Sequence, residues 1–234
     1  MELGMTAKKR NLGEGLMAFY SDIDEAYIPR YRQWHNLEHM PERVSIPGFI
    51  EGRRYLGAEG APGFLMMYET EAVDVLESQA YLGSLDDPTP WTSEALAHFR
   101  KPLRGIYRLL SSCGESDFFK ATWLLTIRLD SDVEITVEQA EAILEDLQGE
   151  GIGSVRFYEI NDHIAQIKTA EKAIYGENNS YKRYLIFIEN SYSAGRKAIV
   201  EDRHEGAFSE LLKRDGKALV DEYSIEYYLR SPDE

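Results

Sequence analysis

Short apolar runs alternate along the chain with longer segments in which apolar residues recur at helical spacing. In the first half, the runs typical of β-strands lie at residues 16–20, 49–56, 64–69 and 103–110. The segments with helical spacing lie at residues 22–42, 71–85 and 91–100. Turn residues separate these elements at positions 47–48, 60–63 and 86–90.

The second half repeats this order of elements. Strands are predicted at residues 122–129, 155–160, 184–189 and 220–229, and helices at residues 136–147 and 194–213. Thr136 is expected to cap the first of these helices, with Glu138 and Glu141 near its positive end. Aligning the two halves sets the letters RRY against RFY, MMYE against IFIE and YRLLSS against YYLRS. This internal repeat indicates two related units.

Each half is therefore predicted to be a β-α-β-β-α-β unit of the ferredoxin-like kind, and the fold class is α+β. Such a unit has helices on one face of an antiparallel sheet, and its other face must also be covered. Two units placed sheet to sheet cover each other and enclose a cavity. We expect the units at residues 15–114 and 118–231, after a flexible leader at residues 1–14.

Composition and charge narrow the class of protein. The net charge of −15, from 41 acidic and 26 basic residues, repels phosphate backbones and anionic membranes, so we expect neither as a partner. No apolar run approaches the ~20 residues that span a bilayer. The single cysteine, Cys113, excludes an internal disulfide framework, and a cytoplasmic location is expected.

Residues 34–43 hold the densest group of chemically active side chains, reading Trp-His-Asn-Leu-Glu-His-Met-Pro-Glu-Arg. Two of the five histidines, His35 and His39, stand four positions apart here. On a helix this spacing puts both imidazoles on one face. Because histidine exchanges protons near neutral pH, the pair predicts general acid–base chemistry.

A metal site is the alternative interpretation of the same run. His35-Asn36-Leu37-Glu38-His39 matches H-x-x-E-H, the inverted zinc-protease motif. That motif needs a long helix and a third ligand from a later helix, whereas Pro41 is expected to end this helix soon after His39. The zinc-protease interpretation is therefore disfavoured, and we expect no metal, although a metal site without protease activity stays open.

The motif and its surroundings resemble a known family. Tyr31, Trp34, the His-Asn-Leu-Glu-His run and Pro41-Glu42-Arg43 are followed by Pro47-Gly48-Phe49, Arg53-Arg54-Tyr55, Tyr68-Glu69, Pro90-Trp91-Thr92 and Tyr107-Arg108. This pattern over residues 15–112 resembles the EthD-like branch of the dimeric α+β barrel superfamily. The resemblance implies a barrel of two ferredoxin-like modules, here fused in tandem. It also implies a pocket between sheet and helices for small, often aromatic or cyclic, substrates.

Roles can be assigned to the side chains of the run. His35 or His39 is expected to act as general base and acid, and Glu38 to orient an imidazole. Asn36 can donate a hydrogen bond to a developing oxyanion. The predicted substrate-binding residues are Tyr20, Trp34, Arg43, Arg53, Arg54 and His98. Strand alternation sends Arg53 and Arg54 to opposite faces, so at most one of them is expected in the pocket.

The leading functional hypothesis is a lyase or isomerase that needs no cofactor and acts on a small hydrophobic, oxygenated catabolite, aromatic or cyclic. Two alternatives stay open: a non-catalytic protein that binds a small ligand, and a cofactor-free oxygenase. The second half has no counterpart of the histidine run, so the first half is expected to carry the chemistry while the second completes the barrel. Sheet-mediated pairing in the superfamily implies a homodimer.

Overall fold

Eight strands close into one antiparallel barrel in the computed structural model, which describes residues 13–114, 122–176, 178–192, 205–215 and 218–232. The strands are β1 (Gly15–Ile23), β2 (Phe49–Gly57), β3 (Phe64–Thr70), β4 (Phe99–Gly114), β5 (Trp123–Leu129), β6 (Ile152–Ile160), β7 (Tyr184–Asn190) and β8 (Leu219–Arg230). Their order around the barrel is β1-β3-β2-β8-β5-β7-β6-β4. All eight predicted strands are therefore present, and the α+β class is confirmed.

The strand order is the same in the two halves. The first four strands lie in the order β4-β1-β3-β2 and the last four in the order β8-β5-β7-β6. Pairing of β2 with β8 and of β4 with β6 joins the halves and closes the barrel. Each strand thus has two hydrogen-bonded neighbours, and no sheet edge is left among the described strands.

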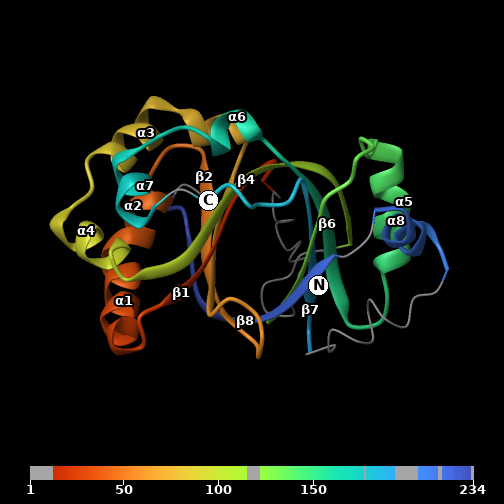
Figure 1. Cartoon of the computed structure of the whole chain (residues 1–234), viewed down its shortest axis with the longest axis horizontal. Helices are drawn as coiled ribbons and strands as arrows, with labels where there is room; N and C mark the ends of the chain where they lie inside the picture. The colour runs from red at the N-terminus through yellow and green to blue at the C-terminus, as the bar shows by residue number, and fades with distance from the viewer. Residues whose placement is uncertain (1–12, 115–121, 177, 193–204, 216–217, 233–234) are drawn as a thin grey trace, which may run out of the picture.

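Helices cover the outside of the barrel in two groups (Figure 1). The first group follows β1 and β3 and comprises η1 (Glu25–Tyr27), α1 (Ile28–Trp34), η2 (His35–His39), α2 (Met40–Val44), η3 (Val73–Glu77), α3 (Gln79–Asp86) and α4 (Pro90–Leu96). The second group, on the opposite side, comprises α5 (Val137–Leu147) and α8 (Ala207–Asp215). Thr136 forms the predicted N-cap of α5 within a full capping box.

Two short helices were not predicted from the sequence. They are α6 (Asp162–Ala165) and α7 (Ala170–Tyr175), which follow β6 in the second half. Figure 1 shows α7 among the helices of the first group, where it contacts α3 and α4 over the first half of the barrel. The second half therefore does more than complete the barrel, because it also supplies cover for the helices of the first half.

Other differences concern element boundaries. The predicted helix at 71–85 is divided at Ser78, whose extended backbone (ψ 150°) starts α3 and whose hydroxyl accepts a hydrogen bond from the Tyr81 N–H. Most of the predicted leader and residues 194–204 of the last predicted helix lie outside the described residues. Within the described residues, no helix has the length and apolarity to cross a membrane.

The barrel interior combines tyrosines with a buried ionic network. Tyr20, Tyr55, Tyr107, Tyr158 and Tyr223 point inward, each at most 2% exposed. At one level of the barrel, Arg53 of β2 binds Glu189 of β7 at 2.5 Å, and Arg156 of β6 binds Glu69 of β3. Arg53 aligns with Arg156 and Glu69 aligns with Glu189 in the internal repeat. Each half therefore supplies an arginine that pairs with a glutamate of the other half.

Candidate active site

A pocket lies between the outer face of the barrel and the helices of the first group. Its lining residues come from β1, β3 and β4 below and from the helices above, and they are Met17, Phe19, Trp34, His39, Arg43, Met66, Tyr68, Tyr81, Leu85, Leu96, Phe99, Arg104, Thr169, Glu171 and Tyr175. The cavity measures about 30 Å³, room for about two water molecules. A larger occupant therefore requires the lining side chains, including two flexible methionines, to move.

The histidine run forms a π-helical turn, η2, between α1 and α2. Its hydrogen bond from the Met40 N–H to the His35 carbonyl spans five residues instead of four. The wider turn leaves Leu37 72% exposed and buries both imidazoles against the sheet. Single π-helical turns within α-helices occur frequently at functional sites, which agrees with the chemistry predicted for this run.

His35 is fully buried and has a partner at each ring nitrogen. Its Nδ1 lies 3.1 Å from Arg54 Nη1, and its Nε2 lies 3.3 Å from Tyr68 Oη. Because a guanidinium only donates, Nδ1 accepts and the neutral ring carries its proton on Nε2. Burial lowers the pKa of His35 well below its ordinary value, and the charges of Arg54 and Arg43 lower it further. His35 is therefore a fixed neutral imidazole that orients the Tyr68 hydroxyl.

His39 is the histidine that lines the pocket. Its ring packs on Trp34 at 4.4 Å between centroids, and its Nδ1 has no hydrogen-bond partner among the described residues. Burial lowers the pKa of His39 well below its ordinary value, and Arg43 and His35 add to this effect. At neutral pH His39 is thus an uncharged base with a free nitrogen, whereas both nitrogens of His35 are engaged.

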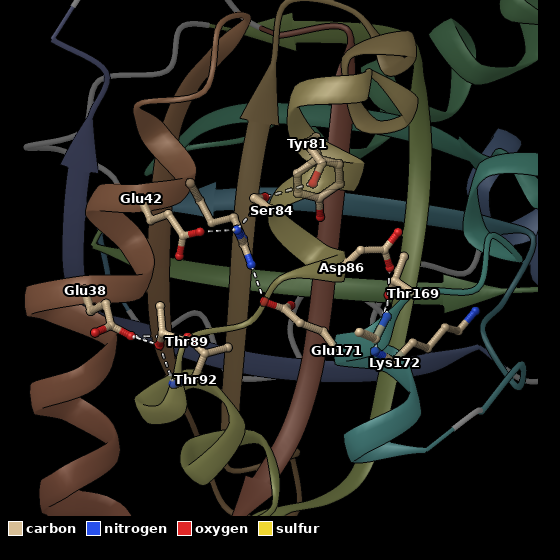
Figure 2. Close-up of polar contacts among 12 residues, drawn as sticks. Glu38, Glu42, Tyr81, Ser84, Asp86, Thr89, Thr92, Thr169, Glu171 and Lys172 are labelled. Atoms are coloured by element: carbon tan, nitrogen blue, oxygen red, sulfur yellow. Dashed lines mark hydrogen bonds and ion pairs between the residues drawn. The ribbon is translucent and has the colours of Figure 1, made fainter.

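Arg43 brings a buried positive charge to the pocket. Its guanidinium is 1% exposed, donates to Ser84 Oγ at 2.7 Å and to Glu42 at 3.2 Å, and forms a short ion pair with Glu171 of α7. Figure 2 shows Glu42, Ser84 and Glu171 converging from three different helices. Burial raises the pKa of Glu171, and the neighbouring Arg43 opposes that rise. The pair therefore joins the two halves across the pocket.

Glu38 does not contact an imidazole, contrary to the role expected for it. Its carboxylate accepts hydrogen bonds from Thr89 Oγ1 at 2.6 Å and from Thr92 Oγ1 at 3.3 Å (Figure 2). Thr92 in turn accepts from Trp34 Nε1 at 3.1 Å. The π-helical turn directs the Glu38 side chain toward α4. Glu38 therefore influences His39 only indirectly, through Thr92 and the Trp34 indole that packs on the His39 ring.

Asn36 and Arg54 lie on the far side of His35 from the pocket. Arg54 Nη1 donates to Asn36 Oδ1 at 2.8 Å, and Arg54 Nε donates to Glu226 of β8 at 2.6 Å. Asn36 thus uses its carbonyl oxygen to hold Arg54, and Arg54 fixes the tautomer of His35. Neither residue lines the cavity.

Three more of the predicted substrate-binding residues lie elsewhere. Tyr20 and Arg53 point into the barrel, because strand alternation places their neighbours Phe19 and Arg54 on the helix side. His98 is 36% exposed, stacks on Tyr27 at 3.9 Å and binds Asp24 at 2.9 Å. Of the predicted residues, Trp34, His39 and Arg43 line the pocket.

Several pocket residues were not among the predicted ones. Tyr68 and Arg104 could have been considered, because strand alternation puts both on the same sheet face as Phe19. Glu171 and Tyr175 carry no sequence signal that links them to residues 34–43. They reach the pocket only because α7 packs over the first half of the barrel.

The metal interpretation finds no arrangement to support it in the described part of the chain. No group of three or more His, Cys, Asp or Glu residues is placed there to hold a metal ion. In the His-Asn-Leu-Glu-His run itself, the Glu38 carboxylate faces threonine hydroxyls and both His35 nitrogens are engaged.

No protein-family model matches the chain, and no curated protein matches it by sequence. Solved structures do match. An anthrone oxidase-like protein superposes with a TM-score of 0.60 at 8% identity, covering 95% of each chain. A putative monooxygenase from Lactobacillus acidophilus gives 0.56 at 8% identity, over 93% of this chain and 97% of that one. A chlorite dismutase from Candidatus Nitrospira defluvii gives 0.53 at 10% identity, over 92% of each chain.

These neighbours belong to the dimeric α+β barrel superfamily. The chain shares the fold of these structures. At 8–10% sequence identity, this similarity shows a shared fold and does not show a shared function. The EthD-like branch within the superfamily is not confirmed.

Proposed function

We propose that the pocket beside His39 is an active site for general acid–base chemistry on a small, oxygenated, largely apolar substrate. The observation that carries this proposal is the state of His39. It is a buried, neutral imidazole with an unpartnered nitrogen, in a cavity that also contains two guanidinium groups. A base, positive charge and apolar walls in one enclosed space are what enolisation of a carbonyl compound requires.

The reaction follows from these groups. His39 takes a proton from carbon next to a carbonyl group, and the electron pair of the C–H bond moves onto the carbonyl oxygen. The positive charge of Arg43 stabilises the resulting oxyanion in a site of low dielectric constant. The imidazolium then returns the proton to another carbon, which gives an isomerase. Alternatively, the enolate re-forms the carbonyl, a C=C bond forms as the bond from the neighbouring carbon to a leaving group breaks, and the imidazolium protonates that group, which gives a lyase. No cofactor is needed for either outcome.

The test is the His39→Gln variant. It keeps the size and a hydrogen-bonding amide but cannot exchange a proton, so turnover of carbonyl substrates should fall by about 100-fold or more. Solvent deuterium incorporation, measured by NMR on a panel of cyclic ketones and lactones, reports the proton transfer directly. Leu37→Gln on the exposed side of the same turn is the matched control. Full activity of His39→Gln would remove the basis of the proposal.

A cofactor-free oxygenase is the second candidate. The structural neighbours titled anthrone oxidase-like protein and putative monooxygenase favour it. The first step is the same deprotonation, after which the electron-rich substrate carbanion reduces dioxygen and is itself oxidised. An oxygen electrode distinguishes the two candidates: an isomerase or lyase works equally well under nitrogen, whereas an oxygenase consumes oxygen in step with substrate. Ligand binding without any product would instead support a non-catalytic binding protein.

We further propose that the chain consists of two ferredoxin-like modules fused in tandem, at residues 15–114 and 118–231. The identical strand order of the two halves supports this division. A homodimer stays a prediction, but free sheet edges no longer argue for it, because the described strands close into a barrel within one chain. Light scattering of the purified protein measures the oligomeric state.

A further inference from the structure

We propose that Arg104 is the binding site for an anionic group of the substrate, and that the pocket takes a small aromatic carboxylate. This inference rests on the proposed function insofar as it concerns the same pocket. It goes beyond that function by naming the chemical class of the substrate and the residue that recognises it.

The two guanidinium groups of the pocket differ in their partners. Arg43 has two carboxylate partners, Glu171 and Glu42. Arg104 donates one hydrogen bond, from Nη2 to Tyr81 Oη at 3.2 Å, and within the described residues it has no carboxylate at ion-pair distance. Glu171 influences Arg104 only as a more distant charge. Arg104 is therefore the pocket cation with guanidinium N–H groups available to a ligand.

The charge of the lining agrees with an anionic ligand. Both carboxylates near the pocket, Glu171 and Glu42, pair with Arg43, whereas within the described residues no carboxylate lies at ion-pair distance from Arg104. The whole chain carries −15. A guanidinium without a carboxylate partner inside a pocket is stabilised when an anion binds to it.

The walls near Arg104 define the rest of the ligand. Arg104 lies directly opposite Phe19 in the pairing of β4 with β1. Phe19 makes edge contacts with Phe99 at 5.4 Å and with Tyr175 at 5.1 Å between ring centroids. A flat ligand ring must displace at least one of these contacting rings or a neighbouring methionine, and it can then present a carboxylate to the guanidinium beside Phe19, which binds carboxylates in a bidentate manner.

Binding of benzoate and of its neutral isostere benzamide tests the inference, by calorimetry and by protein-detected NMR without turnover. The wild-type protein should bind benzoate at least about tenfold more tightly than benzamide. In Arg104→Gln, benzoate affinity should fall by about 10- to 100-fold, since a charge-assisted bidentate pair is lost. Benzamide affinity should stay within about twofold.

Arg108→Gln is the matched control, because Arg108 lies four positions along the same strand, is 51% exposed and pairs with Glu159. It should bind benzoate like the wild type. Arg104→Lys should keep part of the preference for benzoate, and it replaces the glutamine variant if the latter does not fold. Equal affinity of the wild-type protein for benzoate and benzamide, or unchanged benzoate binding by Arg104→Gln, would overturn the proposal.

Failure of this inference can be told apart from failure of the proposed function. His39→Gln should lose turnover but retain benzoate binding, because the imidazole is not part of the anion site. If Arg104→Gln binds benzoate normally while His39→Gln is inactive, acid–base catalysis stands and only the substrate class is wrong. If benzoate binding depends on Arg104 but His39→Gln stays active, the anion site at Arg104 stands and the catalytic role of His39 is wrong.

Discussion

Arg43 of the first half and Glu171 of the second half form a buried ion pair although 128 positions separate them in the chain. Their side chains are 1% and 7% exposed. Helix α7 also packs on α3 and α4, and the Ala170 N–H donates to Asp86 Oδ1 at 2.9 Å. The pair therefore closes one wall of the pocket.

Removing one member of this pair should destabilise the protein strongly. We expect Glu171→Ala to lower the free energy of unfolding by about 3–5 kcal/mol, because it leaves the Arg43 charge buried without its main partner. The double variant Arg43→Met/Glu171→Leu should recover most of that loss. Urea unfolding followed by circular dichroism gives the values. Arg108→Ala is the control and should change stability little, because Arg108 is 51% exposed and its partner Glu159 keeps its ion pair with Arg183. A double variant that is no more stable than Glu171→Ala would contradict this explanation.

The ionic network in the barrel predicts a pH effect on stability. Three carboxylates, Glu51, Glu69 and Glu189, share two guanidiniums, and burial together with the neighbouring Glu69 raises the pKa of Glu51 well above its ordinary value. The folded state therefore binds a proton that the unfolded state releases above about pH 4.3, so stability falls as pH rises above that value.

Glu51→Gln should remove this dependence. The amide mimics the protonated carboxyl group, so the variant should melt at least about 2 °C higher than the wild type at pH 7.5. Near pH 4 the difference should vanish, since both proteins are then uncharged at this position. Scanning calorimetry between pH 4 and pH 8 provides the comparison. A variant that is less stable than the wild type at pH 7.5 would show that Glu51 is ionised in the folded protein.

The lowered pKa of His39 predicts the pH range of activity. As pH falls, an unperturbed histidine becomes protonated near pH 6.5, whereas His39 should stay neutral to a lower pH. The acidic limb of the pH–rate profile should therefore lie below pH 6.5. NMR of the imidazole Cε1 protons, assigned with His39→Gln, measures the titration independently. A midpoint at or above 6.5 would mean that the ring is not buried as described.

The hydrogen bond between Trp34 and Thr92 should support the wall that orients His39. Thr92→Val keeps the shape of the side chain but leaves the Trp34 Nε1 proton without an acceptor, which should destabilise the protein by about 1–3 kcal/mol. Thr92→Ser keeps a hydroxyl that accepts from Trp34 and donates to Glu38, so its effect should be smaller. Thermal unfolding of both variants shows whether Thr92→Val loses more stability than the second variant, as expected.

Much of this fold follows from local pattern. The eight strands and helix α5 were predictable because apolar periodicity and turn residues act over a few positions. The opposite directions of Arg53 and Arg54 follow from the pleat of a strand alone. Helices α6 and α7 were missed because they have only 4 and 6 residues, too short for a periodic pattern.

The sequence by itself determined the order of strands and the position of the histidine run, and it pointed to acid–base chemistry. Only the tertiary structure decided which histidine is available. Arg54 and Tyr68 engage both nitrogens of His35, and these partners come from strands 19 and 33 positions away. Packing of α7 across the barrel brought Glu171 to Arg43, and pairing of β1 with β4 set Arg104 beside Phe19. Such contacts depend on how distant elements are placed, and local propensity does not encode that placement.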